Sequence, residues 1–369
     1  MAQIAPPFPL PAPLTNARLL IVGGVYVDVL NEVTSYPLED SACRALSSIR
    51  RRGGNAGNSA VVLARLLRAH ADDCTVSWVG VVPSRANADS AFALAEFASD
   101  SVDTSLLEEI GGDGVGQPTS FIVLARDTGS RTIVSTRNNC RELSVEHFRA
   151  ALARAAEQLS GAAAAPFGEP RWCHLECREM PSVREMAHAF RANPLPAGAS
   201  VLSLEVEKPH MVPAELLPVF ALCDAIFLSR EFLERNQAAI VEAAPPAEPR
   251  LGGADELEAH AAVRCLRALL AQTPGCRALW IVGWGAHGAF ALDSARGTVL
   301  FQPSFPPAAV VDSVGAGDTF IGAAIYALAC GAGPEEALRC ACAVAGAKVG
   351  RAGFKGLHDF VTFRRSTAV

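Results

Sequence analysis

Two short glycine-containing segments carry the residues best suited to chemistry. The first, Val310-Val-Asp-Ser-Val-Gly-Ala-Gly-Asp-Thr-Phe320, predicts a strand, a tight turn and the start of a helix. Amides at a helix start bind anions, so Gly315, Ala316, Gly317 and the amide of Asp318 form a candidate anion hole for phosphate. The Asp318 carboxylate is placed to take the proton of an attacking hydroxyl. The segment therefore predicts phosphoryl transfer to an alcohol, and the structural alternative is a turn in which Asp318 only caps the helix.

The second segment is Arg51-Arg-Gly-Gly-Asn-Ala-Gly-Asn58, which precedes a helical pattern over 59–69. Gly54 permits close approach to the backbone, and Asn55 and Asn58 lie one helical turn apart on the same side. Carboxamides both donate and accept hydrogen bonds, as sugar hydroxyls require. The segment predicts a neutral polyol-binding site, and its alternative is a glycine turn with an asparagine helix cap.

Three weaker candidates lie elsewhere. Asp28 ends the first predicted strand, at the edge where open α/β sheets bind ligands, and could hold two vicinal hydroxyls or be an ordinary surface residue. Asp40 is a still weaker candidate. In Trp280-Ile-Val-Gly-Trp-Gly-Ala-His-Gly288, the turn containing Gly285, Ala286 and Gly288 could pass beneath a nucleotide or be a generic strand-end turn, and His287 is predicted to face solvent. The chain has no G-x-x-x-x-G-K-[ST] phosphate loop.

The elements that would position these residues alternate along the chain. Short β-branched runs are followed by longer segments with a helical period, at these residues: 19–25 then 56–69, 76–82 then 89–99, 202–206 then 213–221, and 279–284 then 317–329. This order is typical of βαβ units. Runs that are apolar at consecutive positions suit parallel strands covered on both faces. The predicted fold class is α/β, a three-layer α/β/α sandwich with a mostly parallel central sheet.

Two regions interrupt the alternation, 26–52 and 118–136, and the second has the pattern of a β-hairpin. Strands of this kind form a separate small sheet, which could cover the ligand-binding edge as a lid or be an ordinary surface hairpin. The predicted organisation is a disordered extension over 1–16, one domain over 17–360 with the lid inserted from about 26–52 and 115–137, and a tail over 361–369. Segments 161–169 and 243–253 are predicted loop insertions.

Composition excludes several classes of protein. A net charge of −6 with no long basic run argues against nucleic-acid binding, and no apolar stretch reaches the roughly 20 residues of a membrane span. The N-terminus has no basic region of a signal peptide, which favours a soluble, cytoplasmic protein. Eleven scattered cysteines indicate reduced core thiols. Cys173, His174 and Cys177 would alternate between strand faces, so packing is favoured over zinc.

These segments, in this order, resemble the ribokinase-like or pfkB carbohydrate kinases over residues 18–358. Residues 53–58 are similar to the amino-terminal signature of that family and 312–318 to its carboxy-terminal signature, with Ser313 where threonine is usual. Within the family the chain is most similar to the ketohexokinases. That narrower resemblance is carried by Tyr36-Pro-Leu-Glu-Asp-Ser41, Arg52-Gly-Gly-Asn-Ala56, Arg131-Thr-Ile-Val134, Leu204-Glu-Val-Glu-Lys-Pro209, Phe305-Pro-Pro307 and Val344-Ala-Gly346.

The resemblance implies ATP-dependent phosphorylation of a ketose such as D-fructose at the 1-hydroxyl, with Asp318 as base. It implies that Asp28, Gly54, Asn55 and Asn58 hold the sugar, and that Asp40 reaches the sugar of a neighbouring subunit in a homodimer joined through the lid. It places Arg131 on the ATP phosphates. The nucleotide would lie on Gly285, Ala286 and Gly288 together with the segment from Cys342 to Gly346.

The resemblance also implies Mg²⁺ brought by ATP, and a monovalent cation such as K⁺ is a further candidate. Two departures bear on its details. The stretch Phe227-Leu-Ser-Arg-Glu-Phe232 lacks the Asn-x-x-Glu of many family members, so Glu205 or Glu207 is expected to act through water and no metal ligand is assigned. Ser130 replaces an expected asparagine beside the sugar. The alternatives are a family member acting on another sugar, a sugar acid or a nucleoside, and a catalytically silent binding protein.

Overall fold

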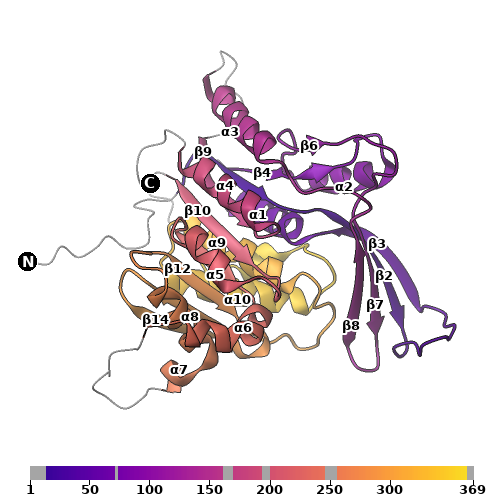
Figure 1. The fold of residues 1–369 in the computed structure, drawn as a ribbon. Helices are drawn as coiled ribbons and strands as arrows, with labels where there is room; N and C mark the ends of the chain where they lie inside the picture. Colours follow the sequence, from indigo (N-terminus) through magenta and orange to yellow (C-terminus); the bar gives the residue numbers. More distant parts are fainter. Residues whose placement is uncertain (1–13, 71–73, 161–168, 193–199, 246–255, 364–369) are drawn as a thin grey trace, which may run out of the picture.

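A central eight-stranded sheet organises the chain in the computed structural model, which describes residues 14–70, 74–160, 169–192, 200–245 and 256–363 (Figure 1). From one edge to the other its strands are β14 (Thr298–Pro303), β13 (Gly288–Asp293), β12 (Leu279–Gly283), β11 (Ala225–Leu228), β10 (Val201–Val206), β9 (Glu169–Glu176), β1 (Ala17–Val22) and β4 (Thr75–Val79). The strands from β12 to β4 are parallel, and β13 and β14 are antiparallel at one edge. The mostly parallel sheet is therefore confirmed.

Helices cover both faces of this sheet. One layer packs with the core that contains Ile21, Leu63 and Ile325, and its helices are α1 (Asn55–His70), α2 (Ala88–Ser99), α9 (Ala316–Ala329) and α10 (Pro334–Val349). The other layer packs with Leu204 and Trp280, and its helices are α3 (Val145–Ser160), α4 (Met180–Arg191), α5 (Pro213–Phe220), α6 (Arg230–Glu242) and α8 (Ala261–Ala271). The α/β/α sandwich follows from consecutive apolar strand residues that are buried on both sides.

Short elements complete the chain. They are the two-stranded pair β5 (Val81–Val82) and β6 (Glu108–Glu109), the helix α7 (Glu256–Ala259), and the 3₁₀ turns η1 (Gly285–His287) and η2 (Leu357–Phe360).

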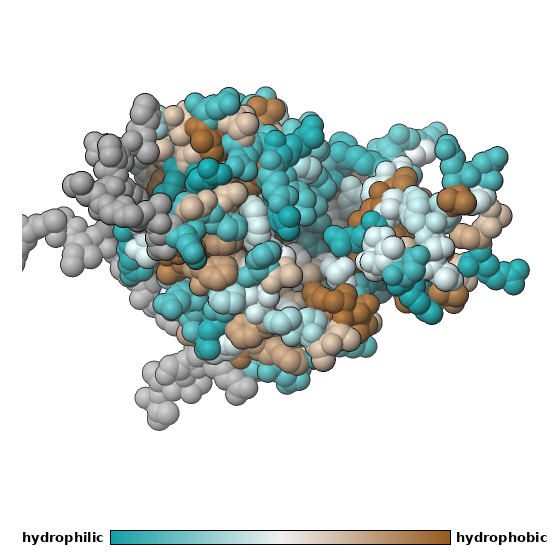
Figure 2. Space-filling view, turned by 90° about the horizontal axis from the view of Figure 1, so that it is seen from below, coloured by the Kyte–Doolittle hydropathy of each residue, from teal (hydrophilic) through white to brown (hydrophobic). Residues whose placement is uncertain are grey.

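A separate four-stranded sheet, which we call the small sheet, projects from the body beside α2 (Figure 1). Its order is β3 (Ser47–Gly53), β2 (Tyr26–Val33), β7 (Thr119–Ala125) and β8 (Ser130–Thr136). The predicted hairpin is β7 and β8. Side chains alternate between faces along a strand, so the register places Asp28, Arg51 and Arg131 on one face. In Figure 2 the small sheet forms its own lobe, with hydrophobic and hydrophilic residues mixed on its surface.

The structure modifies the predicted ends of the domain. Leu14, which lies inside the predicted extension 1–16, is buried, and its amide donates to the carbonyl of Ala329. At the other end, Val361 is buried in the core of the α1 and α9 layer, and Phe363 packs against that core, so the predicted tail 361–369 starts too early. Residues 1–13 and 364–369, and most of the predicted loops 161–169 and 243–253, lie outside the described residues.

The cysteines are single thiols, most of which lie in the core. All eleven cysteines are free thiols, and nine of them are buried, including Cys173 and Cys177. The part of the chain that the structure describes contains no group of three potential metal-ligating side chains. Among the described helices none is long and apolar enough to cross a bilayer.

Candidate active site

The carboxyl ends of the parallel strands meet at one edge of the main sheet, where the starts of α1 and α9 also lie. Glu176 ends β9, and Glu205 lies opposite it in the register of β10. Helix α1 begins with Asn55 and α9 with Ala316. Because helix starts expose amides and strand ends expose side chains, this edge gathers both kinds of group.

The turn before α9, residues 312–318, contains Gly315, whose φ of 82° lies in the left-handed region. A β-carbon there would lie 2.9 Å from the ring of Phe354, so a side chain would also clash. The amide of Ala316 donates to the carbonyl of Ser313 over 3.3 Å. Within the described chain, the amides of Gly317 and Asp318 have no hydrogen-bond partner. The predicted anion-hole amides of Gly317 and Asp318 are therefore available, and the amide of Ala316 makes a long hydrogen bond within the turn.

Asp318 is the third residue of α9, and its side chain does not cap the helix, because the N-cap is Gly315 and no side chain caps that end. One carboxylate oxygen, Oδ2, accepts a hydrogen bond of 2.7 Å from Nδ2 of Asn58. The hydroxyl of Ser59 donates to the Asp318 carbonyl over 3.2 Å. These two bonds connect α1 to α9 and fix the carboxylate, leaving Oδ1 without a recorded partner in the described part of the chain.

Burial raises the pKa of Asp318 well above its ordinary value, and the negative charges of Glu205, Glu207 and Glu176 raise it further. The hydrogen bond from Asn58 opposes this shift because it stabilises the charged form. A carboxylate with a raised pKa is a stronger base than a free one, which suits proton abstraction near neutral pH.

The two predicted asparagines contact different acids. Nδ2 of Asn55 donates to Oε1 of Glu205 over 3.3 Å, while Asn58 binds Asp318. The other oxygen of Glu205 is buried without a hydrogen-bond partner and lies 3.7 Å from Nε2 of His174. Burial raises the pKa of Glu205 and lowers that of His174 to about 4. His174 is therefore neutral at physiological pH, and this pair is not an ion pair.

Asp28 lies on the small sheet against the start of the second segment. A β-carbon on Gly53 would lie 2.2 Å from the Asp28 carboxylate, so the glycine makes room for it. Asp28 is 6% exposed, and burial raises its pKa against the opposing charges of Arg51 and Arg52. Gly54, with φ of 92°, follows and leads into α1. The structure thus brings Asp28 close to the loop that carries the asparagines.

Two arginines of the small sheet contact the turn formed by residues 312–318. Arg51 donates to Oδ2 of Asp312 over 3.0 Å, and Arg131 donates to the hydroxyl of Ser313 over 3.3 Å. Lys348 of α10 is fully buried, and its Nζ lies 2.8 Å from the carbonyl and 2.9 Å from the carboxylate of Asp312. Burial alone would raise the pKa of Asp312, but Arg51 and Lys348 outweigh it and the pKa is lowered.

The predicted nucleotide residues form a second group around the segment 302–305. Gly285 and Ala286 are exposed in η1, and His287 faces solvent as predicted. The hydroxyl of Ser304 donates to the Ala286 carbonyl. A β-carbon on Gly288 would lie 2.0 Å from the Gln302 carbonyl, and one on Gly346 would lie 2.0 Å from the Phe305 carbonyl.

Cys342 is buried on α10, with its thiol 3.9 Å from the Gln302 carbonyl. The segment 302–305 therefore joins the two predicted parts of the nucleotide site. Gly288 and Gly346 have a packing reason to be glycine, whereas a β-carbon on Gly285 would meet open space.

Asp40 does not join the site in the single chain. It is exposed in the turn between β2 and β3, with φ of 56°, and makes no recorded hydrogen bond or ion pair within the described residues.

Sequence reasoning assigned no role to Arg51, Lys348, Glu176 or Arg178. For Glu176 a signal was present, since it is a charged residue that ends an apolar strand, as Asp28 is after the first predicted strand. For the cations, no local pattern marks a partner that lies far away in the sequence.

The chain is similar to known proteins over most of its length. The chain matches the family model for pfkB family carbohydrate kinases over residues 17–176 and 238–357. It is 32% identical to the ketohexokinase of Mus musculus over 350 residues, which cover 93% of this chain and all of the relative. Among solved structures, Arabidopsis thaliana ribokinase complexed with ribose and ATP superposes with a TM-score of 0.63 at 18% identity, covering 95% of this chain and 99% of that one. Fructokinase with bound ATP from Xylella fastidiosa gives 0.63 at 21% identity, covering 92% and 94%. The chain belongs to the pfkB family of carbohydrate kinases.

Proposed function

We propose that this kinase transfers the γ-phosphoryl group of ATP to a primary hydroxyl of a ketose, with D-fructose to fructose 1-phosphate as the leading reaction. One observation carries the proposal: the Asp318 carboxylate is fixed by Asn58 in the first turn of α9, beside the unpartnered amides of Gly317 and Asp318. A general base and an anion hole thus share one helix start. Similarity to a ketohexokinase along the whole chain supports the ketose.

In this mechanism Oδ1 of Asp318 accepts the proton of the sugar hydroxyl as its oxygen attacks the γ-phosphorus. The bond from that phosphorus to the bridging oxygen breaks, and ADP leaves. The amides of Gly317 and Asp318 donate hydrogen bonds to the phosphoryl oxygens as charge develops on them. Arg131, which contacts Ser313 beside the turn, would add positive charge from the small sheet.

The sugar would lie between the two sheets. Asp28, 6% exposed, would accept hydrogen bonds from two hydroxyls, and the free oxygen of Asn58 would accept another. Asn55 would donate to or accept from the sugar next to its bond with Glu205. The backbone at Gly54 would allow the ring to approach the start of α1.

The nucleotide would lie on Gly285, Ala286 and Gly288 and on the α10 segment from Cys342 to Gly346. Mg²⁺ bound to the ATP phosphates would offset their charge, with water supplying most of its ligands. The described residues offer no three-ligand cluster, but the unpartnered oxygen of Glu205 fits a carboxylate that binds the ion through water. Measuring kcat after K⁺ in the assay is replaced by tetramethylammonium tests whether the reaction requires a monovalent cation.

Seven large hydrophobic side chains on the described small sheet and its β2–β3 loop are at least 47% exposed: Tyr36, Leu38, Leu46, Ile49, Phe121, Ile133 and Val134. A homodimer formed through the small sheet would cover such residues and bring Asp40 of the partner subunit toward the sugar. Sedimentation of the purified protein tests this assembly. We place the reaction in the cytoplasm, where ATP is abundant.

The deciding experiment offers ATP with a panel of ketoses, aldoses, sugar acids and nucleosides, and measures ADP release and the position of the new phosphate. Wild-type protein is expected to prefer D-fructose. Asp318→Asn should retain ATP binding and lose about 10³-fold or more in kcat, because it keeps the amides and loses the base. Preference for another substrate would select the alternative pfkB kinase. Absence of turnover with every substrate would select the silent binding protein, and near-normal turnover of Asp318→Asn would refute the role of that residue.

A further inference from the structure

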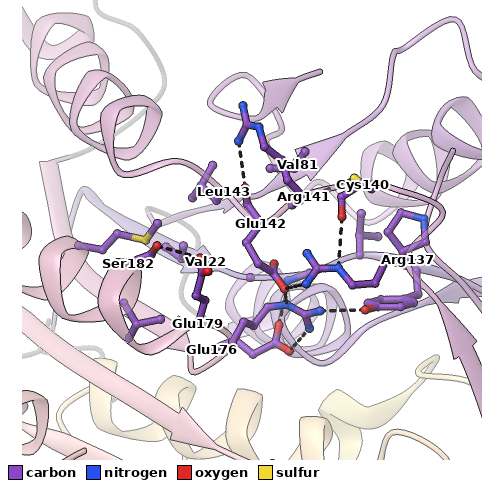
Figure 3. A pocket seen from close by; sticks show the side chains of 18 residues that line it. Val22, Val81, Arg137, Cys140, Arg141, Glu142, Leu143, Glu176, Glu179 and Ser182 are labelled. Atoms are coloured by element: carbon purple, nitrogen blue, oxygen red, sulfur yellow. Dashed lines mark hydrogen bonds and ion pairs between the residues drawn. The ribbon is translucent and has the colours of Figure 1, made fainter. Parts of the chain in front are cut away.

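Arg178 lies just beyond the end of β9, where three segments that connect the small sheet to the body converge. These segments are 23–26 between β1 and β2, 116–118 before β7, and 137–142 after β8. Figure 3 shows the side chains that line the small cavity at this point, about 40 Å³ in volume. Ligand pockets are far larger, roughly 300 Å³ or more, so this cavity has room for water and not for a substrate.

Arg178 uses each of its three side-chain nitrogens. Nη1 donates to Glu176 over 2.7 Å, Nε donates to Glu142 over 2.7 Å, and Nη2 donates to the phenol of Tyr26 over 2.8 Å. The guanidinium is only 14% exposed. It therefore connects the end of β9 to the first residue of β2 and to the segment that follows β8.

The partners of Arg178 extend the network in both directions. The second oxygen of Glu176 accepts the amide of Gly24 over 2.8 Å. Glu142 also pairs with Arg137 over 2.9 Å, immediately after β8. The carboxylates of Glu176 and Glu142 are thus compensated by the guanidinium groups of Arg178 and Arg137. Each hydrogen bond of the network also fixes the position of one connecting segment.

The connecting segments are also bound to one another. The Gln117 side chain donates to the Val25 carbonyl over 2.8 Å, and the Asn138 side chain donates to the Gln117 carbonyl over 2.7 Å. Arg178 and Glu176 join this group to β9 of the main sheet, and the amide of Gly23 also donates to the Val79 carbonyl at the end of β4 over 3.1 Å. Asp28 lies two residues beyond Tyr26 on the same face of β2, so the direction of β2 at Tyr26 determines where the Asp28 carboxylate lies.

We propose that Arg178 is a positioning residue that fixes the small sheet over the active site through Tyr26, Glu142 and Glu176. It contacts no substrate. This inference rests on the proposed function only for the role of Asp28, and its structural part can be measured without any substrate.

The test compares wild type with Arg178→Met, Tyr26→Phe and Glu142→Gln. For Arg178→Met we expect kcat/KM for the sugar to fall roughly tenfold or more, with most of the change in KM, while the Kd for ATP without sugar stays within about threefold. Tyr26→Phe removes one contact of Arg178, and Glu142→Gln weakens the contacts of this side chain with Arg178 and Arg137. Each variant should lose about two- to fivefold in kcat/KM. The double variant Arg178→Met/Glu142→Gln should be no worse than Arg178→Met, because both changes break one network.

Hydrogen exchange gives the readout that needs no substrate. Amides of β2 should exchange faster in Arg178→Met, and amides of β10 and β12 should not change. Arg149→Met is the matched control, because Arg149 pairs with Glu185 on the surface between α3 and α4. This control should match wild type in both measurements.

Loss of Arg178 leaves Glu176 buried without its cation, which could reduce folding stability alone. Arg178→Met/Glu176→Gln removes both charges and separates the two effects. If this variant regains wild-type kcat/KM, Arg178 acts by charge balance and the proposal is overturned. Unchanged sugar KM and unchanged β2 exchange in Arg178→Met would also overturn it, whereas a wild type inactive on every sugar would refute the proposed function alone.

Discussion

The edge of the main sheet gathers buried acids, whereas the face of the small sheet that holds Asp28 also presents two cations, Arg51 and Arg131. At the edge, Asp318, Glu205 and Glu176 are carboxyl groups buried among helix starts and strand ends. The small sheet instead contributes Arg51 and Arg131, which contact Asp312 and Ser313 in the turn before α9. In the proposed mechanism the body therefore supplies the base and the anion hole, while the small sheet supplies cations suited to phosphate. The balance between these acids and arginines therefore depends on how the small sheet is positioned over the edge of the main sheet.

Asp28 is a buried acid on the same face of the small sheet as Arg51 and Arg131, and removing it should have the largest effect on this comparison. Asp28→Ala should raise the KM for the sugar about 100-fold, because two charge-assisted hydrogen bonds worth about 1.5 kcal/mol each are lost. The KM for ATP should stay unchanged in steady-state kinetics.

Glu32→Ala is the matched control for Asp28→Ala, since Glu32 lies on the same strand and face but binds Arg126 at the surface. If Asp28→Ala raised the KM for ATP more than the KM for the sugar, Asp28 would not be a sugar-binding residue.

Removing a cation of the small sheet should have an intermediate effect. Arg131→Met is expected to raise the KM for ATP roughly tenfold, and less at high salt, because Arg131 is exposed and its attraction to phosphate is screened. The measurement is a salt series of KM for ATP and for the sugar. Arg126→Met, at the outer end of the same sheet, should match wild type at every salt concentration, and equal losses in both variants would exclude a local role for Arg131.

A change within the body should shift the pH dependence instead. Asp318 must be deprotonated to act as base, so kcat/KM should fall as pH falls through its raised pKa. Asn58→Ala removes the hydrogen bond that lowers this pKa, so the acid limb should move to higher pH, with a modest loss of rate at high pH.

The groups that set the limb are Glu205, Glu207 and Glu176 on the negative side, with Arg52 and Lys348 on the positive side. The measurement is the pH profile of kcat/KM at constant ionic strength. A limb that stays in place or moves to lower pH in Asn58→Ala would contradict the assignment of Asp318 as the titrating base.

Several parts of the site follow from local sequence. The turn from Asp312 to Asp318 contains its own amides and carboxylate, so its chemistry is readable without any distant residue. Residues 53–58 similarly contain the glycines and asparagines at one helix start. Other predictions needed packing to interpret them: Gly288 and Gly346 looked like nucleotide contacts, yet each also faces a neighbouring carbonyl at close range.

The sequence by itself determined the α/β/α sandwich, because the spacing of apolar residues along the chain shows which segments form strands and which form helices. It also determined the turn and helix start in each of the two glycine segments, because that geometry depends only on neighbouring residues. Only the tertiary structure decided that Asn58 holds Asp318, 260 residues away, and that Arg51 holds Asp312, 261 residues away. It also decided that Arg178 joins Tyr26, Glu142 and Glu176. The physical reason is that a side-chain hydrogen bond requires about 3 Å contact, and which distant residues reach that distance depends on how helices and sheets pack.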